Sequence, residues 1–320
     1  MEYKNILAFR NDRFGEFLLN IPAFRALKGI SGQTRLSLVA DPYVEELAEC
    51  IDCVDEVLTW ENRRHSMSEI VRFSAKLRKK NFDLCVIFNP SKEFNIISFL
   101  SGIPVRVGYS RKWHFLLTHT LKDLKYLEDK HEVDYNLQLA GLIGASAQGR
   151  RPSLDISEDC YLSLPEEFNE KSGFIAVHPW TSDPVKQWPV AFFLLLAEKI
   201  TVELGMKVVI VGGREEAAMK FRFSSYGNDA IIDMTGKTTL KELGAILNRS
   251  RLLVSCDSGP VHLASCLNIP VVAIFRSDMP GKGSKRWGPL SEKSVVVEKP
   301  DLSKIGVEEV LSKIQEVLNK

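Results

Sequence analysis

The sequence lacks long apolar runs and any excess of charge of one sign. Its 42 Lys and Arg residues balance 41 Asp and Glu residues, which leaves a formal net charge of +1. A general nucleic-acid binder usually carries a strong basic excess, so we expect no nucleic-acid partner. The apolar run at 5–9 is too short for a signal peptide, and no segment approaches the roughly 18 apolar residues of a membrane span. We therefore expect a cytoplasmic protein, with any membrane contact peripheral.

Cysteine patterns are equally sparse. Among the six cysteines, Cys50 and Cys53 form one C-x-x-C pair. A zinc site would need a second ligand pair, and a redox motif would need a thioredoxin-like context. We interpret these cysteines as small apolar residues near a helix end, and we predict no metal site and no tightly bound cofactor.

Both halves of the chain alternate short apolar runs with helix-patterned segments, which predicts two α/β domains with parallel sheets. The first half has predicted strands at 5–9, 36–40, 56–58, 84–88 and 105–108, and helices at 17–28, 44–50, 66–79, 93–100 and 133–143. The second half has strands at 174–178, 207–211, 231–233, 252–255 and 271–275, and helices at 190–204, 217–223, 240–248, 261–267 and 307–318. The stretch 149–173 lacks periodicity and is predicted to be a linker between domains 1–155 and 172–320.

Ligands of open α/β sheets bind outside the carboxyl ends of strands, so the loops that follow strands are of most interest. The first such loop is Arg10-Asn11-Asp12-Arg13-Phe14-Gly15-Glu16. Gly15 permits a tight turn, and Glu16 is a carboxylate able to remove a proton from an acceptor hydroxyl. The alternative interpretation is that Asp12 or Glu16 only caps the helix.

The loop at 178–189 follows the first strand of the second half. Its hydroxyl groups on Thr181 and Ser182, together with the Lys186 ammonium, are able to surround a diphosphate. The alternative is a solvated loop whose tryptophan packs on the next helix.

The loop at 212–216 is Gly-Gly-Arg-Glu-Glu after a strand. Gly213 allows close approach of a nucleotide, and Glu215 or Glu216 is suited to accept hydrogen bonds from ribose hydroxyls. The G-x-G-x-x-G fingerprint of dinucleotide-binding folds is missing. The alternative is that the two acids only favour the first turn of a helix.

The most specific loop is Asp257-Ser258-Gly259-Pro260-Val261-His262. A strand, a tight turn and a helix in this order present backbone amides and a hydroxyl to an anion such as a diphosphate. His262 either contacts a phosphate, orients Asp257 or is structural.

Together these segments resemble the heptosyltransferase family of bacterial lipopolysaccharide synthesis, glycosyltransferase family 9. The resemblance spans nearly the whole chain and rests on an ordered set of motifs. These are Ile-Leu-x-x-Arg at 6–10, Gly15-Glu16, Ile21-Pro22-Ala23-x-Arg25-Ala26-Leu27-Lys28, Lys186-x-Trp188-Pro189, Gly212-Gly213, 235–243 and Asp257-Ser258-Gly259-x-x-His262-Leu263-Ala264.

The resemblance implies a GT-B fold: two Rossmann-like doubly wound domains facing a central cleft, with acceptor in the first and nucleotide sugar in the second. The final helix, 307–318, usually returns to the N-terminal domain. The implied reaction inverts the anomeric centre, without a tightly bound metal. The family commonly has Asp where this chain has Glu16, so the base would reach one methylene further.

The implied roles divide the site residues between two substrates. Glu16 and Lys186 are the predicted catalytic residues, and Arg13, Gly15, Arg111 and Lys112 are predicted to bind the acceptor. Predicted donor-binding residues are Thr181, Ser182, Gly213, Glu215, Glu216, Asp257, Ser258, Gly259 and His262.

Family analogy suggests ADP-heptose as donor and a saccharide or lipid-linked acceptor. Trp113 and Phe115 beside Arg111 and Lys112 favour an acceptor loop near a membrane, whereas an ordinary solvated surface is the alternative. Two other functions remain open: a nucleotide-sugar epimerase of GT-B fold, and a non-catalytic nucleotide-sugar-binding protein.

Overall fold

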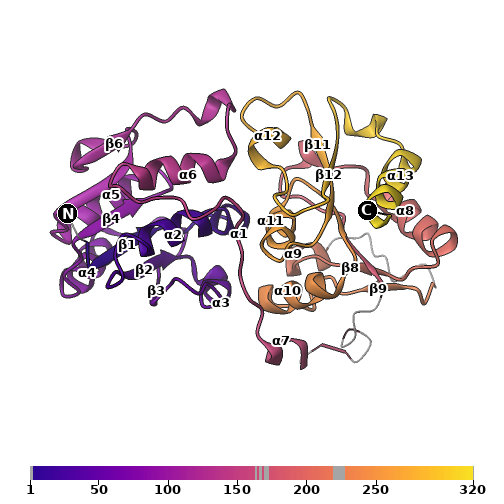
Figure 1. Cartoon of the computed structure of the whole chain (residues 1–320), viewed down its shortest axis with the longest axis horizontal. Coiled ribbons are helices and arrows are strands. Elements are labelled where there is room, and N and C mark those ends of the chain that lie inside the picture. Colours follow the sequence, from indigo (N-terminus) through magenta and orange to yellow (C-terminus); the bar gives the residue numbers. More distant parts are fainter. Residues whose placement is uncertain (1–2, 163, 166–167, 169–172, 219–227, 320) are drawn as a thin grey trace. The chain divides into compact units, whose positions relative to one another are not determined.

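The chain forms two compact units, Met1–Pro152 and Ser153–Lys320, as the computed structural model in Figure 1 shows. The structure describes residues 3–162, 164–165, 168, 173–218 and 228–319. Each unit is built on a six-stranded sheet in which every pair of neighbouring strands is parallel. Since parallel sheets need helical crossovers, each sheet carries helices on both faces.

The sheet of the first unit has the strand order β3-β2-β1-β4-β5-β6. Its strands are β1 (Asn5–Phe9), β2 (Arg35–Ala40), β3 (Glu56–Thr59), β4 (Leu84–Ile87), β5 (Val105–Tyr109) and β6 (His119–Leu121). Its helices are α1 (Phe14–Leu18), α2 (Ile21–Lys28), α3 (Glu45–Ala48), α4 (Met67–Arg78), α5 (Lys92–Leu100) and α6 (Glu132–Gly141), with short 3-10 turns η1 (Pro42–Val44), η2 (His114–Leu116) and η3 (Lys125–Leu127).

Side chains of the central strand β1 alternate between two buried layers. Leu7 and Phe9 belong to a cluster with Phe73 of α4 and Phe94 of α5. Helix α4 packs against α5, and α2 packs against α6. Right-handed crossovers place the two pairs on opposite faces, which explains why β1 is buried on both sides.

The sheet of the second unit has the order β12-β11-β10-β7-β8-β9. Its strands are β7 (Ile175–His178), β8 (Val208–Ile210), β9 (Ile231–Asp233), β10 (Leu253–Cys256), β11 (Val271–Arg276) and β12 (Val295–Lys299). Its helices are α7 (Glu158–Leu162), α8 (Val190–Glu203), α9 (Arg214–Ala217), α10 (Leu240–Arg249), α11 (Gly259–Cys266), α12 (Ser284–Trp287) and α13 (Val307–Leu318), with 3-10 turns η5 (Pro184–Lys186) and η7 (Leu302–Lys304).

Counted from the first strand of each unit, both sheets have the order 3-2-1-4-5-6, that of the doubly wound dinucleotide-binding fold. The chain therefore reverses its winding direction between β1 and β4 in the first unit, and between β7 and β10 in the second. At such a switch point the loops leave the sheet in opposite directions and expose the carboxyl ends of two adjacent strands. The loops singled out after β1, β7 and β10 are at these points.

The helix predicted at 17–28 is in fact two helices, α1 and α2. Pro22 has no N–H to donate to the Leu18 carbonyl, so one continuous helix is unfavourable. The side-chain amide of Asn20 instead donates to the Glu16 carbonyl at 2.8 Å. Glu16 thus lies on a short helix that is separate from α2.

The sequence analysis did not predict two strands that lie at sheet edges, β6 and β12. Strand β6 is short and polar, and it offers no apolar run. Strand β12 begins with three valines, Val295–Val297, a signal that was readable. Helix α9 ends at Ala217, and positions 219–223 of the helix predicted at 217–223 lie outside the described residues.

The predicted linker, 149–173, is partly wrong because its middle belongs to the second unit. Helix α7 packs against α10, and Asn248 donates to the Tyr161 hydroxyl at 2.6 Å. The Arg249 guanidinium lies 4.6 Å from the Tyr161 ring centre. The boundary between the units falls at Pro152 and Ser153.

The last helix packs within its own unit, because the buried side chains of α13 belong to the core of the second unit. Val310, Ile314 and Val317 are examples, and α13 packs against α8 and β11. The return of 307–318 to the N-terminal domain stays a prediction. In the part of the chain that the structure describes, every helix is too short or too polar to span a lipid bilayer.

Candidate active site

The first half-site is built on Arg10, directly after β1. The Arg10 amide donates to the Val39 carbonyl at 2.9 Å, so the backbone still follows the sheet. Its side chain is buried, and Nε lies 2.6 Å from Asp12 Oδ1 while Nη2 lies 3.6 Å from Glu16 Oε2. The Glu16 side chain keeps 32% of its surface exposed. One buried guanidinium thus holds two carboxyl groups, and both are partly exposed, Asp12 at 22% and Glu16 at 32%.

The other predicted acceptor residues fall into two groups. Arg13 is exposed and directly precedes α1, whereas Gly15 is buried inside that helix. The tight turn expected at Gly15 is therefore a helical turn. Arg111 and Lys112 follow β5, in a separate segment, where Arg111 pairs with Asp123 at 2.7 Å. The Lys112 carbonyl accepts a 2.8 Å hydrogen bond from the buried Asn95 amide.

The second half-site joins the loops that follow β7 and β10. The Lys186 ammonium forms an ion pair with the Asp257 carboxylate, although 71 positions separate the two residues. Thr181 Oγ1 donates to the Asp257 carbonyl at 3.4 Å. Ser182 is exposed in the same loop. The predicted residues of these two loops therefore do lie together.

A buried imidazole links the same two strands. His178 Nδ1 lies 3.1 Å from Ser255 Oγ and 3.2 Å from Ser258 Oγ, and the two hydroxyl oxygens are 2.8 Å apart. Burial lowers the pKa of His178 to about 4, so the ring is neutral at physiological pH. Our sequence analysis missed His178 and Ser255 as site residues. Their only signal is their register across the paired strands β7 and β10.

The helix α11 starts directly after Ser258, with Gly259 as its first residue. Its first-turn amides have no partners within the helix and are directed toward its start. His262, one turn into α11, is buried, and its ring centre lies 6.3 Å from that of Trp287. This packing agrees with a structural role for His262, one of the three alternatives given for this residue.

The glycines of the loop after β8 occupy crowded positions. A Cβ atom on Gly212 would lie 2.7 Å from the Trp180 ring, and one on Gly213 would lie 2.8 Å from the Glu216 carboxylate. Glu215 is exposed, whereas Glu216 is half-buried. The loop is thus packed closely against the β7 loop, which carries Trp180.

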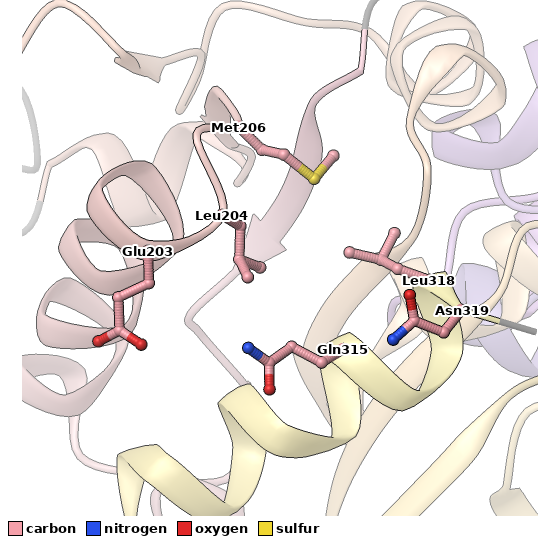
Figure 2. Close-up of a pocket in the computed structure, with 6 residues that line it drawn as sticks. All are labelled: Glu203, Leu204, Met206, Gln315, Leu318 and Asn319. Carbon is pink, nitrogen blue, oxygen red and sulfur yellow. The ribbon is translucent and has the colours of Figure 1, made fainter.

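A separate pocket lies at the opposite edge of the second sheet. It is lined by Glu203, Leu204, Met206, Gln315, Leu318 and Asn319. Figure 2 shows side chains from the end of α8 and from the end of α13 around this pocket. Met206 precedes β8, so the pocket is at the amino ends of the strands and is not part of the half-site described above.

Each unit is a doubly wound parallel sheet with charged loops at its switch point, which is the domain architecture of the GT-B fold. The model of glycosyltransferase family 9 (heptosyltransferase) matches residues 70–313, and the chain belongs to this family. A putative glycosyltransferase of Haemophilus influenzae is 23% identical over 305 residues, which cover 90% of this chain and 87% of that protein.

Two solved structures share the whole fold. A family 9 glycosyl transferase from Veillonella parvula superposes with a TM-score of 0.87 and 22% identity, covering 100% of this chain and 99% of that one. An ADP-heptose lipopolysaccharide heptosyltransferase II of E. coli superposes with a TM-score of 0.81 and 21% identity, covering 98% of each chain. These likenesses confirm the predicted GT-B fold.

The neutral state of His178 predicts a pH-dependent stability. Because its pKa is about 4 in the folded chain and about 6.5 when unfolded, the unfolded state binds more protons between these values. The free energy of unfolding should therefore fall as the pH drops below about 6.5, by about 2 kcal/mol from this group at pH 5. Urea unfolding of His178→Gln at pH 5 and pH 8 should show a smaller difference than the wild type. His119→Gln, at an exposed histidine, is the control; an unchanged difference in His178→Gln would contradict the assignment.

Proposed function

We propose that the chain is an inverting heptosyltransferase that moves heptose from ADP-heptose to a saccharide or lipid-linked acceptor of a cell-surface glycan. Membership of family 9 supports sugar transfer, and the name of the E. coli heptosyltransferase II supports ADP-heptose as donor. The acceptor class follows from the lipopolysaccharide in the same name. The observation that carries the proposal is Glu16, a partly exposed carboxylate on a buried guanidinium at the end of β1.

The second unit is the proposed donor domain. The amides at the start of α11, the Ser258 hydroxyl and Gly259 would bind the diphosphate, because a helix start favours an anion. Lys186 would neutralise the leaving group, and the Asp257 carboxylate holds its ammonium in place. The remaining proposed donor contacts come from Thr181, Ser182, Gly213, Glu215, Glu216 and His262.

The first unit is the proposed acceptor domain, with contacts from Arg13, Gly15, Arg111 and Lys112. Glu16 would take the proton of an acceptor hydroxyl while that oxygen attacks the anomeric carbon. The bond from this carbon to the diphosphate oxygen breaks, and the nucleoside diphosphate leaves with the electron pair. Attack opposite the leaving group inverts the anomeric configuration. The leaving group needs no proton, so charge stabilisation by Lys186 and the α11 amides provides the main assistance.

Family membership favours transfer over both alternatives from the sequence. An epimerase would convert the nucleotide sugar without an acceptor, and a binding protein would leave it unchanged. Product analysis with donor alone and with donor plus acceptor separates the three. Only a transferase forms a new glycosidic bond that depends on the acceptor.

Donor choice is tested by thermal shift. ADP and ADP-sugars should raise the melting temperature more than UDP, GDP and dTDP compounds, because a ligand of the folded state stabilises it by mass action. Lys186→Met should weaken ADP binding about 10- to 100-fold through loss of a charged contact. Lys199→Met, which removes a surface ion-paired lysine, is the matched control. A wild-type preference for another nucleotide would overturn the ADP assignment.

The base assignment is tested at Glu16. Glu16→Gln should reduce kcat by about 10²- to 10⁴-fold and leave donor affinity unchanged, because only proton removal is lost. The matched control is Glu61→Gln, at an exposed carboxylate of the same unit. A Glu16→Gln variant with wild-type kcat would remove Glu16 from this role.

We also propose that the protein is cytoplasmic and touches the membrane through residues 111–116. Trp113 and Phe115 are 48% and 73% exposed, and Lys112 and Trp113 both have left-handed backbone angles. Arg111 and Lys112 directly precede Trp113 in the sequence, and the Lys92 ammonium lies 5.9 Å from the Trp113 ring centre. Exposed aromatic and basic side chains together favour an anionic lipid interface.

Vesicle cosedimentation tests this contact. The wild type should bind vesicles containing phosphatidylglycerol more strongly than vesicles of phosphatidylcholine, and added salt should weaken binding. Phe115→Ser should reduce the bound fraction several-fold because it removes an apolar anchor. Val202→Ser, at an apolar residue that is 82% exposed in the second unit, is the control. Equal binding by wild type and Phe115→Ser would contradict the proposed contact.

A further inference from the structure

The helix that carries Glu16 is too short to fix its own position. Helix α1 spans five residues, Phe14–Leu18, and the side chain of Arg13 before it makes no capping hydrogen bond. A helix of this length gains too few hydrogen bonds to offset the cost of nucleation, so it depends on tertiary contacts. A catalytic group must be held to within about 0.5 Å of its productive position. The contacts that hold α1 are therefore the contacts that hold Glu16.

The end of α1 presents carbonyl groups that need donors from elsewhere. Pro22 has no N–H to offer to the Leu18 carbonyl. The main-chain N–H of Asn20 donates to the Phe17 carbonyl at 3.0 Å, and not to the Glu16 carbonyl four positions earlier. The Glu16 carbonyl instead accepts from Nδ2 of Asn20 at 2.8 Å. A side-chain amide thus replaces a main-chain donor at the residue that carries the proposed base.

A second side-chain amide reaches the same junction from α6. Nδ2 of Asn136 donates to the Leu19 carbonyl at 3.3 Å, across 117 positions of the sequence. Asn20 and Asn136 are both 0% exposed, and the helices α2 and α6 pack against each other. Burying an amide side chain costs free energy unless it forms hydrogen bonds. Both buried amides direct their donors at the end of α1.

The side chain of Glu16 is held separately, by the guanidinium of Arg10. Nη2 of Arg10 lies 3.6 Å from Glu16 Oε2, and Nη1 donates at 3.4 Å to the carbonyl of Phe88, which directly follows β4. The carboxylate is thereby linked to the sheet, while the main chain of the same residue is linked to Asn20. Two contacts at opposite ends of one residue fix its direction, which a single contact does not.

We propose that Asn20 and Asn136 are positioning residues that orient the Glu16 carboxylate for proton removal. Both are buried, so they act through the main chain of α1 and not on the substrate. Loss of either donor would let α1 shift, and a small displacement of the base lengthens the path to the acceptor hydroxyl. The catalytic part of this inference rests on the proposed function of Glu16.

The variants Asn20→Thr and Asn20→Val form a matched pair. They have the same shape, but only the threonine hydroxyl is able to donate to the carbonyl four positions earlier. Asn20→Val should lower kcat about 10- to 100-fold and leave the KM for the donor unchanged, because the base is misplaced. Asn20→Thr should recover most of this loss. Wild-type kcat in Asn20→Val, or equal losses in the two variants, would overturn the proposal.

Two further variants test the second amide and provide a control. Asn136→Leu should lower kcat about 3- to 10-fold, because its hydrogen bond is longer and presumes the same mechanism. The control is Asn5→Val, which removes a side-chain amide that donates to the Lys80 carbonyl at 2.6 Å. Asn5 begins β1, at the opposite end of the strand from Arg10, so this variant should keep the wild-type kcat.

A double variant distinguishes positioning from a general structural defect. If Asn20 acts only through Glu16, Glu16→Gln combined with Asn20→Val should retain the same residual kcat as Glu16→Gln alone. A further decrease in the double variant would show that Asn20 acts by another route, and the proposal would fail.

Hydrogen–deuterium exchange tests the hold on α1 without any substrate. Exchange of the amides in 14–20 should be about fivefold faster in Asn20→Val than in the wild type, as expected for the loss of one hydrogen bond. Asn20→Thr should exchange at nearly the wild-type rate, and Asn5→Val should leave this segment unchanged. Wild-type exchange of 14–20 in Asn20→Val would refute the hold.

These experiments separate the possible failures. If no donor and acceptor pair gives transfer in the wild type, the proposed function fails, while hydrogen exchange still decides whether the amides hold α1. If transfer occurs and depends on Glu16, but Asn20→Val keeps the wild-type kcat, only the positioning role fails. Circular dichroism shows whether the variants are folded; if Asn20→Val is not, Asn136→Leu decides the question by the same two measurements.

Discussion

The structure depends on one topological constraint, the reversal of winding at the centre of each parallel sheet. Between β1 and β4, and again between β7 and β10, successive crossovers run to opposite sides. The carboxyl ends of these central strands are thereby left uncovered by helices, while both faces of the sheet are buried. The polar side chains that this chain places there are Arg10, Asp12 and Glu16 in one unit, and His178, Lys186 and Asp257 in the other.

The two half-sites offset the free-energy cost of burying polar groups in different ways. In the first, Arg10 remains charged because carboxyl groups surround it, and this cost of burial is offset by ion pairing. In the second, His178 is neutral, and two hydroxyl groups contact its Nδ1 atom. A neutral, hydrogen-bonded ring beside the α11 amides leaves the local potential positive for an anionic ligand.

Much of the fold was predictable from the sequence because central parallel strands are continuous apolar runs. Strand β1 matches its prediction residue for residue, and the loops after β1, β7 and β10 were placed correctly. The break between α1 and α2 was also readable, since Pro22 cannot continue a helix, but the periodicity on both sides concealed it. Strand β6, at the sheet edge, lacks an apolar pattern altogether.

The internal organisation of the site was much less predictable. The pairing of His178 with Ser255 depends on the register of two strands that are 77 positions apart. Likewise, Glu132 raises the pKa of Arg10 although it lies on α6, far from Arg10 in the sequence. Local sequence patterns predict which residues lie in each loop. The contacts that those residues make depend on the strand order and register, which local patterns do not reveal.

The contacts among His178, Ser255 and Ser258 form a closed ring with a consequence for hydrogen-bond polarity. Ser255 and Ser258 supply only two hydroxyl hydrogens for the three contacts. A hydroxyl hydrogen that points away from the ring, toward a ligand, therefore leaves one fewer for these contacts. If the neutral imidazole carries its hydrogen on Nε2, the Ser258 hydrogen is needed within the ring, and its oxygen is only an acceptor on the outside. If the hydrogen is on Nδ1, the imidazole donates to Ser255, Ser255 donates to Ser258, and Ser258 is able to donate outward without giving up a hydrogen bond, while its contact with Nδ1 holds no hydrogen. The tautomer of one buried ring thus sets whether Ser258 gives up a hydrogen bond when it donates to an anion at the start of α11.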